Sequence, residues 1–381
     1  MNSKPMDIPF IDLKTQYSEL KLQIDERIQR VLDHGQFILG PEVAELEQRL
    51  ASLTRSKNCI TCASGTDAML MALMALGVGL GDEVITPSFT FIATAEVIVL
   101  AGATPVFVDV EKQTCNLDAT KLRAAFTTRT KAVIPVSLYG QPADMNEINA
   151  IAAEFGVPVI EDAAQSFGAV YHDRWSCNLS LIGCTSFFPS KPLGCYGDGG
   201  AIFTDDDELA QAMREIRVHG QSARYRHTRI GIGGRMDTLQ CGIVLAKLDA
   251  FELEIAKRLE VGQRYTRLLE SCADQVEVVR IKPGRTSAYA QYTILVENRA
   301  MVQKALTVEG IPTAVHYPAP IHRQPAYLRW AAGADCPVSE RLAEKVLSLP
   351  MHAYLDESTQ ARIVAALARA TVSSTWPTVT I

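Results

Sequence analysis

Short apolar runs alternate along this chain with longer segments in which apolar residues recur every three or four positions. The short runs are typical of buried strands, and the longer segments are typical of helices with one apolar face. Their alternation predicts an α/β fold in which a mostly parallel, seven-stranded sheet lies between helices. The expected strands are residues 58–63, 83–87, 105–110, 132–136, 158–162, 184–188 and 201–204, and the clearest helices are residues 20–32, 145–155 and 207–217.

The pattern changes toward the C-terminus. One long helical pattern runs from Thr238 toward Leu269. Strand-like runs follow at residues 276–279 and 289–296. We therefore expect a large domain at residues 1–249 and a smaller α+β domain at residues 250–381, with the boundary inside the long helix.

The composition is that of a soluble enzyme with a large core: 381 residues, 48% hydrophobic content and a formal net charge of -6. No run of like charge indicates a nucleic-acid partner. The longest apolar stretch, residues 68–80, is shorter than the roughly 20 residues of a membrane-spanning helix, and residues 1–12 lack the apolar segment of a signal peptide. A cytoplasmic protein without a membrane partner is expected.

The cysteines are scattered singly. Nine cysteines in a long chain do not form a disulfide framework, and they fit a reducing compartment. Cys59 and Cys62 fall in an expected strand, where residues three apart point to opposite faces, so no metal site is expected there.

The segment Ser186–Gly200 holds one lysine between two prolines and then several glycines. Pro192 disfavours helical backbone at Lys191, which predicts an extended and stiff loop. Beside apolar Phe187 and Phe188, the amine would be partly desolvated, and this favours a nucleophile that forms a Schiff base. A solvated surface lysine is the alternative, but the glycines indicate close approach of a ligand to the backbone.

An acid stands at the end of the strand in residues 158–162. Ligands of open parallel sheets bind beyond the carboxyl ends of the strands, so Asp162 is expected to face a crevice. A carboxylate there would keep the ring nitrogen of pyridoxal phosphate protonated. Capping of a following helix is an equally good interpretation of Asp162 taken alone.

A third candidate is the turn Ser64-Gly65-Thr66, which lies between an expected strand and an expected helix start. Free amides, the helix dipole and the hydroxyls of Ser64 and Thr66 would bind a phosphate. Ordinary helix capping is the alternative.

Together these residues resemble the DegT-like sugar aminotransferases, which are pyridoxal-phosphate enzymes of fold type I. The resemblance covers nearly the whole chain. It rests on the segments Phe10–Leu13, Gly40–Glu42, Ser64–Asp67, Thr86–Thr94, Glu161–Gln165, Ser186–Gly200 and Arg235–Gln240.

The resemblance implies a role for each matching residue. Lys191 would form the Schiff base with the cofactor, and Asp162 would pair with the ring nitrogen. Gln165 would lie on the side of the ring hydroxyl, and Phe91 would stack on the ring. The phosphate would be held by Gly65, Thr66 and Ser186. Related dehydratases replace the lysine by histidine, so Lys191 favours amino transfer.

Within the family the chain is most similar to aminotransferases that act on UDP-2-acetamido-2-deoxy-3-oxo-glucuronate, in the synthesis of bacterial surface polysaccharides such as O-antigen. Arg235 would bind the uronate carboxylate. His316 and Tyr317 would lie at the substrate mouth, and structural roles are nearly as good an interpretation of both. The resemblance also implies L-glutamate as the amino donor and a homodimer with shared active sites.

One position departs from the family, which usually has asparagine two residues before Arg235, donating to the cofactor phosphate of the neighbouring subunit. This chain has Gly233. Losing a charge-assisted hydrogen bond would cost roughly 1.5 to 3 kcal/mol. Gly233→Asn is therefore expected to tighten cofactor binding.

Two other functions stay open. One is amino transfer to a different sugar, such as a 4-keto hexose or an aminocyclitol precursor. The other is a non-catalytic sensor that keeps the fold. The set Lys191, Asp162 and Gln165 disfavours the sensor.

Overall fold

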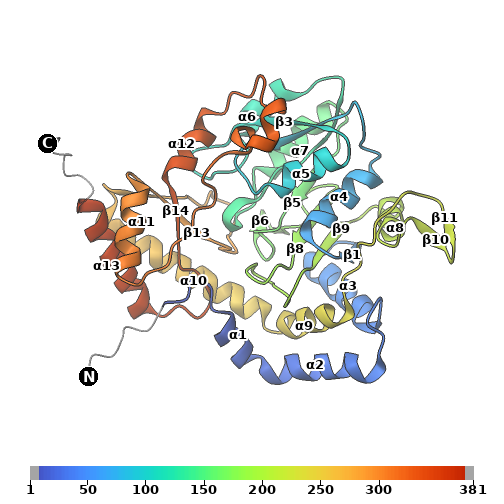
Figure 1. The fold of residues 1–381 in the computed structure, drawn as a ribbon, viewed down its shortest axis with the longest axis horizontal. Helices are drawn as coiled ribbons and strands as arrows, with labels where there is room; N and C mark the ends of the chain where they lie inside the picture. The colour runs from blue at the N-terminus through green and yellow to red at the C-terminus, as the bar shows by residue number, and fades with distance from the viewer. Residues whose placement is uncertain (1–7, 374–381) are drawn as a thin grey trace.

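A single sheet of seven strands forms the centre of the protein, whose computed structural model describes residues 8–373 (Figure 1). A four-stranded part in the order β1-β9-β8-β5 meets a three-stranded part in the order β4-β2-β3. The two parts join where Val133 pairs with Val159 and Val136 with Asp162, both in parallel. The strands are β1 (Asn58–Cys62), β2 (Glu83–Pro87), β3 (Thr104–Val108), β4 (Thr130–Val133), β5 (Ile160–Asp162), β8 (Ile182–Ser186) and β9 (Gly200–Thr204).

Six of these strands run parallel, and β9 runs antiparallel to both of its neighbours. The expectation of a mostly parallel, seven-stranded sheet is confirmed. Because β5 and β8 are parallel neighbours, their carboxyl ends at Asp162 and Ser186 reach the same edge of the sheet.

Alternate residues of each strand pack on opposite faces of the sheet. Ile60 and Ile202 join one apolar cluster with helices α4, α5 and α8, while Cys59 and Phe203 join another with α3 and α9. At the other end of the sheet, the second face is covered by α6 and α7. The helices are α3 (Pro41–Thr54), α4 (Gly65–Ala75), α5 (Ala93–Leu100), α6 (Ala119–Leu122), α7 (Met145–Glu154), α8 (Asp207–Ile216) and α9 (Thr238–Leu248). This alternation is the reason that helices flank both faces.

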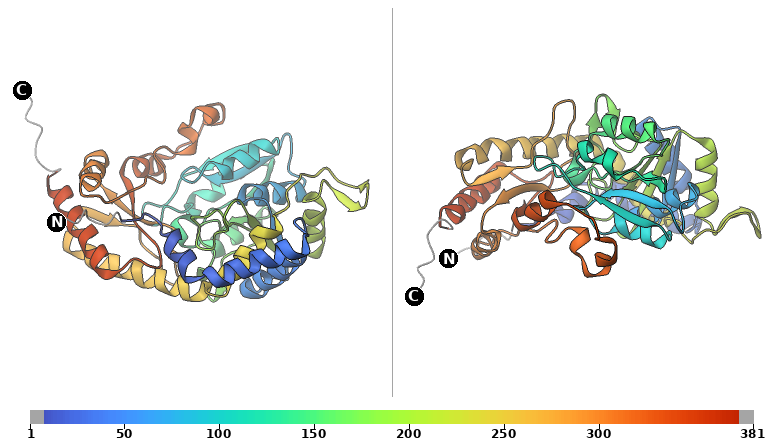
Figure 2. Two further views of the ribbon diagram at one scale, coloured as in Figure 1. Left: turned by 60° about the horizontal axis from the view of Figure 1, so that its bottom comes forward. Right: turned by 90° about the horizontal axis from the view of Figure 1, so that it is seen from above.

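Three smaller features accompany this sheet. The N-terminal helices α1 (Leu13–Glu19) and α2 (Lys21–His34) precede α3, and α2 packs on α9 through Ile24 and Ala246. The hairpin of β10 (Gln221–Ala223) and β11 (Arg226–His227) projects away from the sheet (Figure 2). A second short hairpin consists of β6 (Val170–Tyr171) and β7 (Arg174–Trp175).

The C-terminal part is a second α+β unit. The sheet β12-β13-β14 is antiparallel and packs on α10, α11 and α13. Its elements are α10 (Phe251–Leu269), β12 (Val276–Val278), β13 (Tyr292–Val296), α11 (Arg299–Val308), α12 (Pro337–Lys345), β14 (Val346–Leu349) and α13 (Glu357–Ser373). The short 3-10 helices of the chain are Arg123–Ala125, Leu138–Gly140, Glu270–Cys272, Ile321–Arg323 and Pro325–Trp330.

The expected single helix from Thr238 toward Leu269 is wrong. It is two helices, because α9 ends at Leu248 and α10 begins at Phe251. The division into domains at residues 249 and 250 falls in this interruption and stays a prediction.

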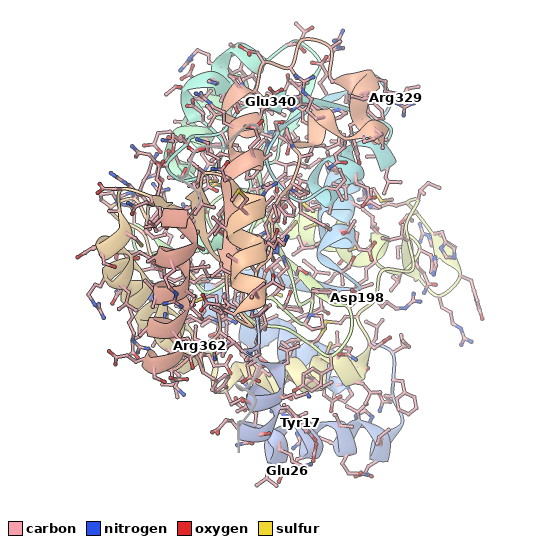
Figure 3. All side chains as sticks on the ribbon, turned by 60° about the vertical axis from the view of Figure 1, so that its left-hand side comes forward. Tyr17, Glu26, Asp198, Arg329, Glu340 and Arg362 are labelled. Carbon is pink, nitrogen blue, oxygen red and sulfur yellow. The ribbon has the colours of Figure 1, made fainter. Side chains whose placement is uncertain are left out.

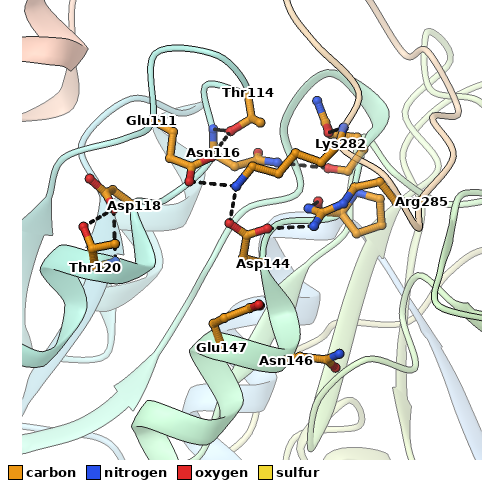
Figure 4. A network of polar contacts seen from close by, with 12 residues as sticks. Glu111, Thr114, Asn116, Asp118, Thr120, Asp144, Asn146, Glu147, Lys282 and Arg285 are labelled. Carbon is orange, nitrogen blue, oxygen red and sulfur yellow. Dashed lines mark hydrogen bonds and ion pairs between the residues drawn. The ribbon is translucent and has the colours of Figure 1, made fainter.

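A network of ion pairs fastens the segment before β13 to the main sheet (Figure 4). Lys282 contacts Glu111 at 2.8 Å and Asp144 at 2.5 Å, and Arg285 contacts Asp144 at 2.7 Å. This network lowers the pKa of Asp144 against the effect of its burial. These ion pairs therefore hold in place the segment that leads into β13.

No helix within residues 8–373 is both long enough and apolar enough to cross a membrane.

Candidate functional site

A cavity of about 420 Å³ opens at the strand ends of the main sheet. This volume is within the range of small-molecule sites. Its lining includes nine residues that the sequence singled out: Gly65, Thr66, Phe91, Asp162, Gln165, Ser186, Lys191, His316 and Tyr317. Arg235 is not among the lining residues, and its role as a substrate ligand stays a prediction.

A larger cavity, of about 1030 Å³, lies between the end of α10 and the outer side of the C-terminal sheet. Its charged side chains include Lys112 and Lys345, which already form ion pairs with Glu277 and Glu297. None of the nine residues above lines it. We therefore place the chemistry in the smaller cavity.

Lys191 closes a tight turn, and the expected extended backbone at this residue stays a prediction. Its N–H donates to the carbonyl of Phe188 at 2.8 Å. The surrounding loop is closed at its base, where Cys195 N–H donates to Phe187 O and Phe187 N–H donates to Gly199 O, both at 2.7 Å. Phe187 is buried in the core, so the loop is anchored on both sides of Lys191.

Burial lowers the pKa of Lys191, and the charge of Asp162 partly opposes this shift. Among the described residues, no hydrogen bond holds the Nζ atom. The expected desolvation of the amine is therefore present. Phe187 is fully buried, whereas Phe188 lines the cavity with 51% of its surface exposed.

The glycines after Lys191 are required by close packing within the protein. A Cβ atom on Gly194 would lie 2.6 Å from the carbonyl oxygen of Pro189, and one on Gly200 would lie 2.6 Å from the backbone of Ser64. Neither glycine lines the cavity. Contacts of protein with protein therefore require these two glycines, and the expected approach of a ligand to the loop stays a prediction.

Asp162 ends β5, and its carboxylate is fixed by two donors. Thr94 Oγ1 donates to it at 2.8 Å, and Ala164 N–H donates at 3.2 Å. Burial raises the pKa of Asp162, while these hydrogen bonds and the charge of Lys191 oppose the shift. A turn, and no helix, follows at residues 164–168, so the capping interpretation does not hold.

The phosphate candidate lies at the first turn of α4. Ser64 is the N-cap and accepts from Asp67 N–H at 3.0 Å, which confirms the capping interpretation for this residue. The first turn of a helix still leaves N–H groups free for an anion. A Cβ atom on Gly65 would lie 2.7 Å from Cβ of Ser186, so the glycine lets the end of β8 meet this helix.

Gln165 has a defined amide orientation because both ends are bonded. Its Oε1 accepts from Tyr139 N–H at 2.7 Å, and its Nε2 donates to the hydroxyl of Tyr317 at 3.2 Å. The Tyr139 hydroxyl in turn donates to the carbonyl of His316. Tyr139 therefore connects Gln165 and His316, and the sequence offered no signal for it.

The surroundings of His316 favour the neutral imidazole. Burial, helped by the charge of Lys191, lowers its pKa to about 4. Its Nδ1 contacts Ser348 Oγ at 2.9 Å, and Ser348 lies on β14. The C-terminal unit thus supplies one wall of the cavity.

Four further polar residues line the cavity or hold its groups, and the sequence had not assigned them. Thr94 binds Asp162, and Thr90 and Gln291 line the cavity. Thr90 Oγ1 and Gln291 Oε1 are buried without a partner among the described residues. Asp198, labelled in Figure 3, is exposed and also lines the cavity. Thr90 and Thr94 belong to a segment of the family resemblance, which was the available signal.

Residues 18–368 match the DegT/DnrJ/EryC1/StrS aminotransferase family. A UDP-2-acetamido-2-deoxy-3-oxo-D-glucuronate aminotransferase from Pseudomonas aeruginosa is 57% identical, over 94% of this chain and 99% of that protein. A pleiotropic regulatory protein from Geobacillus stearothermophilus is 44% identical, over 95% and 98%.

Solved structures show the same fold. An aminotransferase of this family from Brucella abortus has a TM-score of 0.93 and 43% identity, covering 96% of this chain and 99% of that one. NtdA from Bacillus subtilis, with bound cofactor PMP, has a TM-score of 0.87 and 29% identity, covering 97% and 86%. The chain belongs to the DegT/DnrJ/EryC1/StrS aminotransferase family, whose members are pyridoxal phosphate-dependent enzymes of fold type I.

The cavity residues fit this cofactor. A helix start with adjacent hydroxyls suits a phosphate, a buried carboxylate suits a protonated ring nitrogen, and a desolvated amine suits an aldehyde. The buried Thr90 Oγ1, which has no partner within residues 8–373, gives an additional polar atom for a bound group.

Gly233 is exposed and lies near His219 and Arg235. A Cβ atom at this position would lie 3.2 Å from the His219 ring and 3.8 Å from the Arg235 guanidinium. The backbone of Gly233 pairs with Val218. An asparagine there would be held beside Arg235 after a small shift of the imidazole.

Proposed function

We propose that this protein transfers the amino group of L-glutamate to a UDP-linked 3-keto-N-acetyl-hexuronate, a step in the synthesis of bacterial surface polysaccharide such as O-antigen. The observation that carries the proposal is the 57% identity to the Pseudomonas aeruginosa enzyme over 99% of its length. The cavity supports the reaction type, because Lys191 and Asp162 line it together.

Lys191 is the catalytic residue of this proposal. Pyridoxal phosphate, when bound, supplies an aldehyde for amines and an electron sink for a substrate carbanion. Burial favours the neutral form of the Lys191 amine. A neutral Nζ can accept a proton from a substrate carbon and return it two atoms further along, which is a 1,3-proton shift. Ser190 and Phe188 line the cavity together with Lys191.

The remaining cavity residues would bind and orient the cofactor. Gly65, Thr66 and Ser186 would hold its phosphate at the start of α4, and Asp162 would keep its ring nitrogen protonated. Gln165 would face the ring hydroxyl and Phe91 the ring. The carboxylate of Asp162 can do this because Thr94 and Ala164 favour its charged form.

The substrate assignment rests on fewer contacts. Arg235 would bind the uronate carboxylate from the neighbouring subunit of a homodimer, since it lies outside the cavity of its own chain. His316 and Tyr317 line the cavity and would contact the sugar. We propose a cytoplasmic homodimer with shared active sites.

The decisive experiment separates the two half-reactions. The purified protein with pyridoxal phosphate is mixed with L-glutamate alone, and bleaching of its visible absorbance band is expected. It is then given UDP-keto-sugars with and without a C6 carboxylate, and the amino sugar is detected by mass spectrometry. Turnover of the 3-keto uronate is expected to exceed that of neutral 3-keto and 4-keto sugars.

Lys191→Ala is the first control, and we expect it to lose turnover by at least about 100-fold together with the visible band. A band that glutamate leaves unchanged would favour the sensor function. Equal use of neutral 4-keto sugars would reassign the substrate without changing the reaction type.

A further inference from the structure

The loop that carries Lys191 is held by two polar side chains of a single helix, α9. We propose that Lys247, together with Gln240, is a positioning residue that fixes the Lys191 loop for reaction with the cofactor. This inference rests on the proposed role of Lys191.

Lys247 contacts the loop through both its hydrogen bond and its charge. Its Nζ donates to the carbonyl of Gly194 at 2.7 Å, only three residues beyond Lys191. The same Nζ lies 4.2 Å from the centroid of the Tyr196 ring, within the range of a cation–π contact. One side chain therefore restrains two positions of the loop.

Gln240 holds the same stretch of backbone. Its Oε1 accepts from Tyr196 N–H at 2.8 Å, and its Nε2 contacts Tyr196 O at 3.4 Å. Residues 240 and 247 are two helical turns apart and lie on one face of α9. This face is aimed at the loop rather than at solvent, because α9 is buried along most of its length.

The burial of Lys247 is hard to explain by stability alone. Only 2% of the residue is exposed, and the hydrogen bond of its Nζ goes to a neutral carbonyl, with no carboxylate in ion-pair contact within residues 8–373. Glu254 is the acidic group facing it, and that carboxylate already accepts from Gln16 at 2.8 Å and from Tyr354 at 2.7 Å. An apolar side chain would avoid the desolvation of an ammonium group.

The same burial lowers the pKa of Lys247 to about 8. Folding thus bears a penalty for the charged side chain at neutral pH, whereas the hydrogen bond and the cation–π contact of the amine both go to the Lys191 loop. A residue that served only the core would not need the amine.

The test compares Lys247→Met with wild type. Methionine fills the buried space, so we expect the melting temperature of the apo-protein to change by less than about 3 °C. The visible band after addition of pyridoxal phosphate is expected to appear roughly tenfold more slowly, or with roughly tenfold weaker affinity, because Lys191 is less well placed. Lys247→Arg, which keeps a charged donor, is expected to recover part of the rate.

Lys257→Met is the matched control. Lys257 lies on α10 with its Nζ 5.4 Å from the centroid of the Tyr354 ring. Its replacement removes a cation–π contact that does not involve the Lys191 loop, so we expect wild-type kinetics. Gln240→Leu provides a second route should Lys247→Met fail to fold, and the same slowing is expected.

Wild-type kinetics in both Lys247→Met and Gln240→Leu would overturn the inference while leaving the proposed function intact. An equal loss in Lys257→Met would also overturn it, because the effect would then be general. If the wild-type protein forms no visible band, the proposed function itself fails.

Discussion

Two regions of the molecule bring reactive types of side chain together. One is the cavity with Lys191 and Asp162, and the other is the set of contacts that runs from Ser88 through His322 to Glu340. Ser88 Oγ contacts His322 Nδ1 at 2.5 Å, and His322 Nε2 contacts Glu340 Oε1 at 3.1 Å. The residue types and their order are those of a serine hydrolase triad, but the two ring nitrogens have exchanged partners, since in the triad Nε2 faces the serine and Nδ1 faces the acid. Yet Ser88 is fully buried, and His322 is only 2% exposed.

The cavity has the opposite character. Lys191 and Asp162 line open space, and two nearby polar atoms, Thr90 Oγ1 and Gln291 Oε1, are buried without partners among the described residues. In the Ser88–His322–Glu340 chain, both ring nitrogens of the histidine are bonded. The accessibility of the side chains and the presence of polar atoms without hydrogen-bond partners therefore distinguish a reactive site from a structural one better than the residue types do.

The largest expected difference is between Asp162→Asn and Glu340→Gln. Asparagine keeps the shape of Asp162 and one acceptor but removes the charge, so turnover with glutamate should fall by roughly tenfold to a hundredfold. Glu340→Gln should leave turnover within about twofold of wild type. Steady-state kinetics and the dissociation constant of pyridoxal phosphate measure both, and comparable losses in the two variants would remove the distinction.

Ser88→Ala tests whether the contacts of Ser88, His322 and Glu340 serve stability alone. The substitution leaves Nδ1 of the buried His322 unpaired, which should lower the free energy of unfolding by about 1 to 3 kcal/mol. Chemical denaturation measures this value. Turnover of the folded protein should be unchanged, and a large loss of turnover at full stability would show that Ser88 contributes to catalysis.

Thr94→Val tests the support of Asp162 with a smaller expected effect. The variant keeps the shape of the side chain and removes the donor, which should raise the pKa of Asp162 further, because this hydrogen bond favours the charged carboxylate. We expect turnover near neutral pH to fall by roughly fivefold, equivalent to about 1 kcal/mol. An unchanged pH–rate profile would mean that Thr94 does not tune Asp162.

Gly233→Asn is expected to have the smallest effect. The new amide could donate to the cofactor phosphate of the neighbouring subunit, but the His219 ring 3.2 Å from the Cβ position has to shift. The affinity for pyridoxal phosphate should therefore rise by only about threefold, less than the full worth of one hydrogen bond. Equilibrium titration of the apo-protein measures the change, and an unchanged dissociation constant contradicts the prediction.

The candidate residues that the structure brings into one cavity carry local signals. Asp162 follows an apolar strand, Gly65 lies between a strand and a helix, and Lys191 stands between two prolines. Each pattern spans only a few residues, so it can be recognised without knowing how the chain folds back on itself. The turn that Lys191 closes has no such local signal, because its hydrogen bond to Phe188 and the anchoring of Phe187 depend on the surrounding core.

The sequence alone determines the alternation of strands and helices, the glycine turn at Gly65 and the position of Lys191 between two prolines, because backbone preferences and apolar periodicity act over short distances. Tertiary structure decided that Thr94 binds Asp162, that Tyr139 orients Gln165 and that Lys247 holds the Lys191 loop. These partners lie 68, 26 and 53 positions from the groups they bind. Such contacts arise only when sheet order and helix packing bring distant segments together and bury their polar groups, which then require partners.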